Sequence, residues 1–217
     1  MDVVVAGGHG KVARGLLERL AAGGDRARGL IRNPDHAVDL ERVGAEPVLA
    51  DLESEDDLSP RLAGADAVVF AAGAGPGSGP ERKRTVDLGG ALKLIAAARD
   101  RGVRRYVMVS AMGAADPSAG PPAMRPYLEA KGEADAALSD SGLAWTIVRP
   151  GRLTDDPPTG RVAAAQRLGR RGEITRDDTA AVLAATLRAP NTIGLTFEVL
   201  SGDTPVEEAV AALAGAG

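Results

Sequence analysis

The stretch Val3-Val4-Val5-Ala6-Gly7-Gly8-His9-Gly10-Lys11-Val12-Ala13 decides the fold. Its first four residues predict a buried β-strand, and its glycines predict a tight turn into a helix that extends to Ala22. The turn reads as G-x-x-G-x-x-A from Gly7 or as G-x-G-x-x-A from Gly8, and both patterns end at Ala13. Residues without side chains let a pyrophosphate reach backbone N–H groups at a helix N-terminus, so we expect a dinucleotide here. The alternative is a glycine turn with a purely structural role.

Short apolar runs alternate with amphipathic stretches along the rest of the chain. Strands that are apolar throughout are typical of a parallel sheet with helices on both faces. The pattern therefore predicts an α/β fold, a three-layer, doubly wound parallel sheet of the Rossmann type in a single domain. The seven predicted strands are residues 3–6, 27–31, 46–50, 67–71, 105–109, 144–148 and 196–200.

Length and composition limit the possible functions. With 217 residues and 44% hydrophobic content, the chain can form one sizeable core. We expect one NAD(P)-binding Rossmann domain over residues 1–217, with a small substrate-side region within residues 150–217. The net charge of −4 argues against nucleic acid as a partner. Because the chain has no Cys and only two His, we expect no disulfide, no thiolate chemistry and no metal.

The sequence contains no obvious targeting signal. Its first residues lack the basic flank and the length of a signal peptide, and no run reaches about 18 uninterrupted apolar residues. We therefore expect a soluble, cytoplasmic protein without membrane contact. Its oligomeric state, monomer or homodimer, stays open.

Local patterns predict caps and loops. Ser54 is expected to cap a helix with acids in its first turn, and Thr175 with Asp178 resembles a capping box. Two loops rich in Gly, Pro, Ala and Ser, residues 73–80 and 113–122, follow predicted strands at the edge where open α/β folds bind ligands. The Arg-rich stretch at Arg161, Arg167, Arg170 and Arg171 is expected to be solvated surface.

The end of the second strand bears on which dinucleotide binds. An acidic residue there would bind the ribose 2′-hydroxyl of NAD, whereas this chain has Arg32, 22 positions after Gly10. The planar guanidinium suits a phosphate dianion, so we expect NADP, with NAD the weaker candidate. Lys11 is a second candidate cation. Asp51 either accepts a hydrogen bond from the adenine amino group or is a helix N-cap.

Four motifs together resemble a known family. They are the Gly7–Val12 turn, Tyr106-Val107-Met108-Val109-Ser110-Ala111, Tyr127-Leu128-Glu129-Ala130-Lys131 and Trp145-Thr146-Ile147-Val148-Arg149-Pro150-Gly151. The chain resembles, over essentially its whole length, the atypical short-chain dehydrogenase/reductase group. This group contains NAD(P)H-binding or NmrA-like proteins, with sugar-epimerase-like and flavin or biliverdin reductase relatives.

The resemblance implies a catalytic set of Ser110, Tyr127 and Lys131. In the wider family a Tyr-x-x-x-Lys pair is catalytic, and the Lys cation would lower the Tyr pKa so that the phenol exchanges a proton as hydride moves. Ser110 would hydrogen-bond the substrate oxygen. The alternative is a helix surface pair with a capping Ser, and the 17-residue interval from Ser110 to Tyr127 departs from the shorter spacing of relatives.

The resemblance and the glycine turn together imply one cofactor site. His9 either contacts phosphate or faces solvent, and the expected role of the 150–151 loop is to border the nicotinamide. The expected cofactor-binding residues are Gly7, Gly8, His9, Gly10, Lys11, Val12, Arg32, Asp51, Leu52, Ala71, Ala72, Gly73, Ser110, Lys131, Pro150 and Gly151.

Three functions follow as hypotheses. The first is an NADPH-dependent reductase of a small carbonyl, quinone or flavin-like acceptor. The second is a regulatory protein that senses NADP(H) without turnover, and the third is an epimerase or isomerase with tightly held NAD. Because little chain remains after residue 155, the substrate region is expected to be small and open, which disfavours a nucleotide-sugar epimerase.

Overall fold

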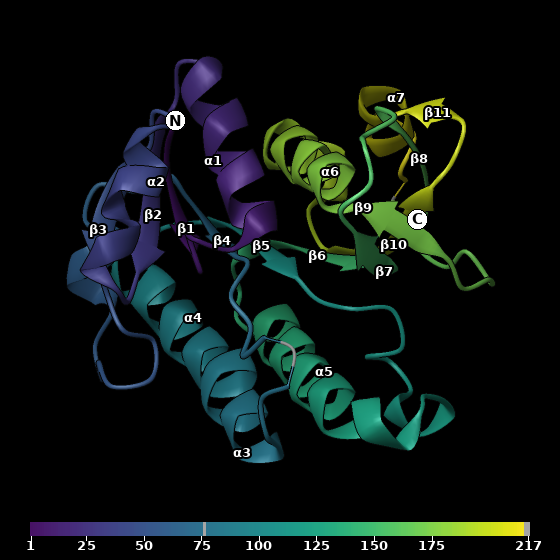
Figure 1. Cartoon of the computed structure of the whole chain (residues 1–217), viewed down its shortest axis with the longest axis horizontal. Coiled ribbons are helices and arrows are strands. Elements are labelled where there is room, and N and C mark those ends of the chain that lie inside the picture. The colour runs from purple at the N-terminus through teal and green to yellow at the C-terminus, as the bar shows by residue number, and fades with distance from the viewer. Residues whose placement is uncertain (76, 215–217) are drawn as a thin grey trace.

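A nine-stranded sheet forms the centre of the computed structural model, which describes residues 1–75 and 77–214 (Figure 1). Its order is β11-β8-β10-β6-β5-β4-β1-β2-β3, and β7 and β9 form a separate two-stranded sheet. The strands are β1 (Asp2–Ala6), β2 (Arg26–Ile31), β3 (Glu46–Leu49), β4 (Ala67–Phe70), β5 (Arg105–Val109), β6 (Ala144–Pro150), β7 (Arg152–Thr154), β8 (Arg161–Ala165), β9 (Glu173–Thr175), β10 (Leu195–Ser201) and β11 (Thr204–Pro205).

Helices cover both faces of the sheet, with α1 and α6 on one side and α4 and α5 on the other (Figure 1). The α-helices are α1 (Lys11–Ala22), α2 (Ala37–Glu41), α3 (Pro80–Arg82), α4 (Ala91–Asp100), α5 (Arg125–Ser139), α6 (Arg176–Arg188) and α7 (Val206–Ala211). A π-helix, η3 (Lys83–Gly90), joins α3 to α4. Short 3₁₀ helices are η1 (Pro34–His36), η2 (Ser59–Leu62), η4 (Pro117–Ala119), η5 (Pro122–Met124) and η6 (Pro190–Thr192).

The side chains of β1 show why the fold has three layers. Val3 and Val5 enter the core that contains Leu17 of α1 and residues of α6. Val4 and Ala6 enter the other core, formed with α4 and α5. Because successive side chains of a strand point to opposite faces, an entirely apolar strand needs a helical layer on each side. The predicted doubly wound Rossmann sheet is therefore confirmed.

The order of the strands in the sheet indicates the edge at which a ligand would bind. β1 pairs in parallel with β2 on one side and with β4 on the other. The order reverses between β1 and β4, and open sheets bind ligands outside the carboxyl ends of the strands at such a point. The two loops predicted to be functional follow β4 and β5 at this edge, and Pro76 in the first of them lies outside the described residues.

The seven predicted strands are all present, with ends that differ by at most two residues. Four short strands were missed, β7, β8, β9 and β11, all from the region after residue 150. β8 reads Arg-Val-Ala-Ala-Ala and pairs antiparallel with β10, and its strand signal is weak because Ala is depleted in strands. The four arginines of the Arg-rich stretch are exposed, as expected. Residues 150–214 contribute β8, β10 and β11 to the central sheet, and they also form the separate β7 and β9 pair and the helices α6 and α7.

The two predicted caps have different outcomes. The Thr175 hydroxyl accepts a hydrogen bond from the Asp178 backbone N–H at 2.9 Å and begins α6, as predicted. The prediction that Ser54 begins a helix is wrong, since turns occupy this segment. Lys93 Nζ donates to the carbonyl oxygens of Leu52, Glu53 and Glu55 and so holds this segment in its turn.

Candidate functional site: a dinucleotide cleft beside a buried charge network

The glycine turn after β1 is pressed against the end of β4. Gly7 has a φ of +79°, and a Cβ on it would lie 2.6 Å from the Cα of Ala72. A Cβ on Gly8 would lie 2.8 Å from the Cα of Gly29. Side chains at these two positions would therefore force the strands apart and close the space in front of α1. Gly10 then caps α1 with extended backbone.

A cavity of about 340 Å³ opens at this turn, at the switch between β1 and β4. Its walls come from the turn, from the ends of β2, β3 and β4, and from α3 and η3. The glycine turn fits a pyrophosphate because the backbone approaches closely and α1 points its N-terminus at it. The lining residues are Gly7, His9, Gly10, Leu30, Ile31, Arg32, Asn33, His36, Ala50, Asp51, Leu52, Glu53, Ala71, Ala72, Gly73, Arg82 and Val86.

Nine of the sixteen expected cofactor residues line this cavity and seven do not. The nine are Gly7, His9, Gly10, Arg32, Asp51, Leu52, Ala71, Ala72 and Gly73. The seven outside it are Gly8, Lys11, Val12, Ser110, Lys131, Pro150 and Gly151.

Four residues outside the cavity have structural partners. Lys11 Nζ donates to Asp155 Oδ2 at 2.6 Å, and both side chains are more than half exposed. Val12 is buried in the core beside α1. Pro150 is a buried residue of β6, and a Cβ on Gly151 would lie 2.3 Å from Leu200 and 2.5 Å from a backbone oxygen of Gly172. The glycine after Pro150 thus permits close packing within the protein.

His9 is not a solvated turn residue. Its ring stacks on His36 with the centroids 3.5 Å apart and the planes at 11°. Its Nε2 donates to Asp39 Oδ2 at 3.0 Å, and this bond lowers the pKa of Asp39. Since both rings line the cavity, the pair fixes the wall between the glycine turn and the loop after β2.

Arg32 and Asp51 line the cavity where β2 and β3 end. Arg32 Nη1 donates to Glu53 Oε2 at 3.1 Å, and the Arg32 side chain is 58% exposed. Asp51 Oδ1 accepts from the Glu53 backbone N–H at 2.9 Å. Although burial opposes it, this backbone bond together with the Ser54 hydroxyl lowers the pKa of Asp51. Asp51 therefore stabilises a turn and not the helix N-terminus expected as its alternative role, and its place in the cavity wall permits an adenine contact.

Ser110, at the end of β5, is buried and already paired. Its hydroxyl donates to Asp135 Oδ2 at 2.8 Å. The same oxygen accepts from Arg149 Nε at 3.0 Å and Nη2 at 2.8 Å. Burial raises the pKa of Asp135, although Arg149 and the Ser110 hydroxyl oppose the shift. Ser110 can give its proton to a substrate oxygen only by breaking its bond to Asp135.

Lys131 is buried where α5 meets the carboxyl ends of β4 and β5. Its Nζ donates to the carbonyl oxygens of Val109 at 3.1 Å and Ala72 at 3.4 Å. Asp87 Oδ1 lies 3.4 Å from the same nitrogen without a hydrogen bond, and Asp87 Oδ2 accepts from the Ala74 backbone N–H at 3.1 Å. Asp87 comes from the π-helix η3, an arrangement that often marks functional sites.

Tyr127 lies between two lysines. Lys83 Nζ is 5.3 Å and Lys131 Nζ is 5.9 Å from its ring centroid. Burial raises the pKa of the Tyr127 phenol, Lys131 opposes the shift, and Asp87 and Asp135 reinforce it. Lys131 thus acts on the Tyr127 pKa in the expected direction, but burial outweighs it, because the sequence motif showed the cation but neither the burial nor the two carboxylates.

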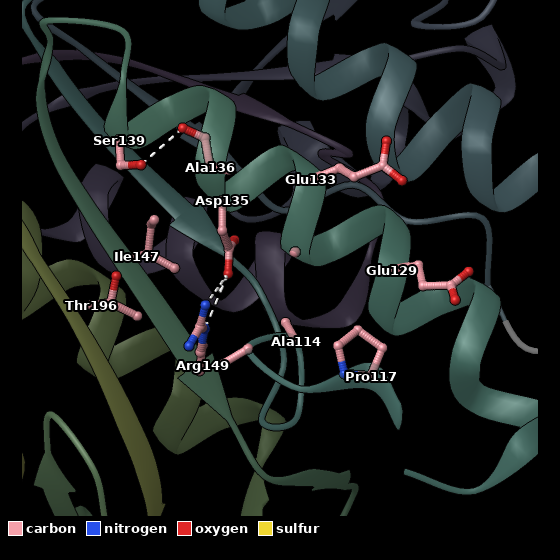
Figure 2. A pocket seen from close by; sticks show the side chains of 12 residues that line it. Ala114, Pro117, Glu129, Glu133, Asp135, Ala136, Ser139, Ile147, Arg149 and Thr196 are labelled. Atoms are coloured by element: carbon pink, nitrogen blue, oxygen red, sulfur yellow. Dashed lines mark hydrogen bonds and ion pairs between the residues drawn. The ribbon is translucent and has the colours of Figure 1, made fainter. Parts of the chain in front are cut away.

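A second cavity, of about 540 Å³, lies on the other side of α5. Figure 2 shows Asp135 of α5 and Arg149 of β6 pointing toward each other, while Glu129 and Glu133 point away from Arg149. Within the part of the chain that the structure describes, no hydrogen bond joins Ser110 to Tyr127. The structure therefore brings Lys131 and Tyr127 together and places Ser110 in a separate group with Asp135 and Arg149.

Comparison with known proteins identifies the family. The model of the NAD(P)H-binding family matches residues 7–190. The chain belongs to this NAD(P)H-binding family. The match starts at the glycine turn, and a nicotinamide dinucleotide is therefore the cofactor class of the cavity. The resemblance to atypical short-chain dehydrogenases/reductases is confirmed.

Two similar proteins align with nearly the whole chain, and a third aligns with 69% of it. The uncharacterized sugar epimerase YhfK of Bacillus subtilis is 40% identical, and the alignment covers 97% of this chain and 99% of YhfK. A solved structure from Bacillus halodurans, provisionally named an NAD-dependent epimerase/dehydratase, has 45% identity and a TM-score of 0.92, covering 96% of this chain and 97% of the other. An NAD(P)H azoreductase of Xenophilus azovorans is 29% identical over 69% of this chain and 47% of its own length.

Four charged residues of the site were not predicted: Glu53, Asp87, Asp135 and Arg149. Arg149 was part of a quoted motif, but its partner was not visible. Asp135 had one available signal, since it lies four residues after Lys131 and so on the same face of the helix. Asp87 and Glu53 had none, because each meets its partner only through the packing of distant segments.

Two findings concern other site types. Among residues 1–75 and 77–214, every helix is too short or too polar to span a bilayer. The same residues contain no group of three or more His, Asp or Glu side chains placed to hold a metal ion.

Proposed function

We propose that the protein is an NADPH-dependent reductase of a small carbonyl, quinone or flavin-like acceptor. Membership of the NAD(P)H-binding family and similarity to an NAD(P)H azoreductase support an oxidoreductase. One observation carries the proposal: the Lys131 ammonium joins the cofactor cavity to the Tyr127 phenol. It donates to the carbonyl of Ala72 in the cavity wall and lies 5.9 Å from the Tyr127 ring.

The roles of the residues follow from their protonation. When bound, the cofactor supplies a hydride to the acceptor. The raised pKa of Tyr127 keeps the phenol protonated at neutral pH, so it can donate a proton to the reduced oxygen or nitrogen of the acceptor. Lys131 provides a fixed positive charge beside it. Ser110, whose proton is held by Asp135, orients the acceptor through a bridging water, which donates one hydrogen bond to the Ser110 oxygen and one to the acceptor oxygen.

The preference for NADP over NAD rests on Arg32. Its guanidinium lines the adenosine side of the cavity and is largely exposed, so a 2′-phosphate can reach it. The cytoplasmic location expected from the sequence stays a prediction.

The experiment follows NADPH and NADH oxidation by the purified protein with a panel of quinones, flavins and small carbonyls. Tyr127→Phe should lower turnover about 100-fold while changing the NADPH dissociation constant less than about twofold. The chain offers a matched control in Tyr106→Phe, which removes the only other phenol, a buried hydroxyl without a hydrogen-bond partner in β5. Full turnover by Tyr127→Phe would remove this residue from the reaction.

The other two functions give different results in the same assay. A cofactor sensor would bind NADPH, but none of the acceptors in the panel would lead to NADPH oxidation. An epimerase, the activity that the names of two similar proteins suggest, would retain cofactor on purification and consume no external NADPH. Against the epimerase, the strands β7 to β11 and the helices α6 and α7 occupy much of residues 150–214 and leave little chain to hold a nucleotide sugar.

A further inference from the structure

Glu53 bridges the two arginines of the cofactor cavity. Its Oε2 accepts from Arg32 Nη1 at 3.1 Å and from Arg82 Nη2 at 3.2 Å. Its Oε1 accepts from the Thr85 hydroxyl at 2.8 Å. Arg32 follows β2 and Arg82 belongs to α3, so one carboxylate joins two separate walls of the cavity.

The backbone holds Glu53 in this position. Lys93 Nζ donates to the carbonyl oxygens of Leu52 at 3.2 Å, Glu53 at 2.9 Å and Glu55 at 2.8 Å. The Glu53 backbone N–H donates to Asp51 Oδ1. Glu53 is thus fixed at its backbone on both sides, and only its side chain is free to move away from the arginines.

The bridge is weak enough to exchange. The side chains of Arg32 and Arg82 are 58% and 43% exposed, and that of Glu53 is 28% exposed. Ion pairs this exposed are weak, because water and salt screen them. A phosphate monoester has up to two negative charges and three acceptor oxygens, so it binds a guanidinium more strongly than one carboxylate does.

We propose that Glu53 is an internal competitor of the 2′-phosphate for Arg32, and that it limits how strongly the protein prefers NADPH to NADH. The inference rests on the proposed role of Arg32 as the 2′-phosphate ligand. An unphosphorylated ribose leaves the bridge intact. A 2′-phosphate takes Arg32 from Glu53 and meets the negative charge of the displaced carboxylate, which reduces the gain in affinity.

The test compares dissociation constants of NADPH and NADH by cofactor fluorescence for the wild type, Glu53→Gln, Arg32→Ala and the double variant. Glu53→Gln keeps the shape of the side chain and removes its charge. We expect it to tighten NADPH binding about fivefold and to change NADH binding less than about twofold. In the Arg32→Ala background, Glu53→Gln should have a much smaller effect on NADPH.

The matched control is Glu46→Gln. Glu46 is an exposed carboxylate of β3 that pairs with Arg26, away from the cavity. The Glu46→Gln substitution removes the same unit of charge, so it measures the effect of net charge alone. NADPH binding should stay within about twofold of the wild type.

Two outcomes would overturn the inference. Glu53→Gln could weaken NADH binding, which would show that Glu53 binds the ribose hydroxyls, or it could change NADPH binding no more than Glu46→Gln does. A failure of the proposed preference for NADPH would give a different result from a failure of the Glu53 inference. In that case the wild type would bind NADH at least as tightly as NADPH, and Arg32→Ala would not affect NADPH.

Discussion

Two carboxylates of the molecule, Glu53 in the wall of the cofactor cavity and Asp135 on α5, each bridge two polar groups, but their surroundings differ. Glu53 holds Arg32 and Arg82 with side chains that are between 28% and 58% exposed. Asp135 holds Ser110 and Arg149 with a side chain that is 5% exposed. Water and salt screen the first group and are nearly excluded from the second.

The difference separates two uses of charge in one protein. In the exposed group each pair contributes little, so a ligand can replace it, and the group can set affinity and selectivity. In the buried group each partner depends on the other, because an ion left alone in the interior is costly. The buried group therefore fixes geometry, and burial itself raises the pKa of both Tyr127 and Asp135.

The largest expected effect comes from removing the buried carboxylate. Asp135→Ala leaves Arg149 and the Ser110 hydroxyl without their acceptor, and it should lower the free energy of unfolding by about 3 kcal/mol. Urea denaturation measures this. Glu133→Ala on the same helix is the matched control, because Glu133 is half exposed and its pair with Arg84 is 3.3 Å long, and it should cost less than about 0.5 kcal/mol. Equal losses for the two variants would show that burial does not distinguish the two kinds of pair.

The fold was predictable where the information is local. The residues of β1 and the turn to α1 carry both the apolar run and the glycines, and the structure confirms each of them. The helix expected after Ser54 failed for a non-local reason: Lys93, about forty residues away, takes the carbonyl oxygens of that segment. The sequence did not predict β8, because a strand that pairs with a neighbour on each side, here β10 and β11, can be stabilised by that pairing alone.

The sequence predicted which residues form part of the site, but it did not predict which residues they pair with. The Tyr127 and Lys131 motif indicates two neighbouring groups on one helix face, and the structure places them together. It does not indicate Asp135 as the acceptor of Ser110, 25 residues away, or Glu53 as the partner of Arg32, 21 residues away. Since burial sets the direction of the Tyr127 pKa shift and Glu53 limits the freedom of Arg32, the chemistry of the motif needed the tertiary structure.

The pH dependence of stability tests the buried group more finely. The pKa of Asp135 is raised above its value in the unfolded chain, about 3.9, so the folded protein binds that proton more tightly. The resulting stability is fully present below about pH 4 and is lost as the pH rises through the folded pKa. Compared with Asp135→Asn, the wild type should therefore lose stability between pH 4 and 7. The measurement is urea unfolding of both proteins across this range. A relative gain by the wild type would mean that the bonds from Arg149 outweigh burial.

The smallest expected effect is the coupling between Arg32 and Glu53 in the protein without ligand. A double-mutant cycle of Arg32→Ala and Glu53→Ala should give a coupling free energy below about 1 kcal/mol, which decreases further in high salt because the pair is exposed. The same cycle on Asp135 and Arg149 should give a larger coupling that salt hardly changes. A coupling of about 2 kcal/mol or more between Arg32 and Glu53, insensitive to salt, would contradict the comparison. It would also mean that no phosphate could easily displace Glu53, because the ligand would first have to replace a strong internal pair.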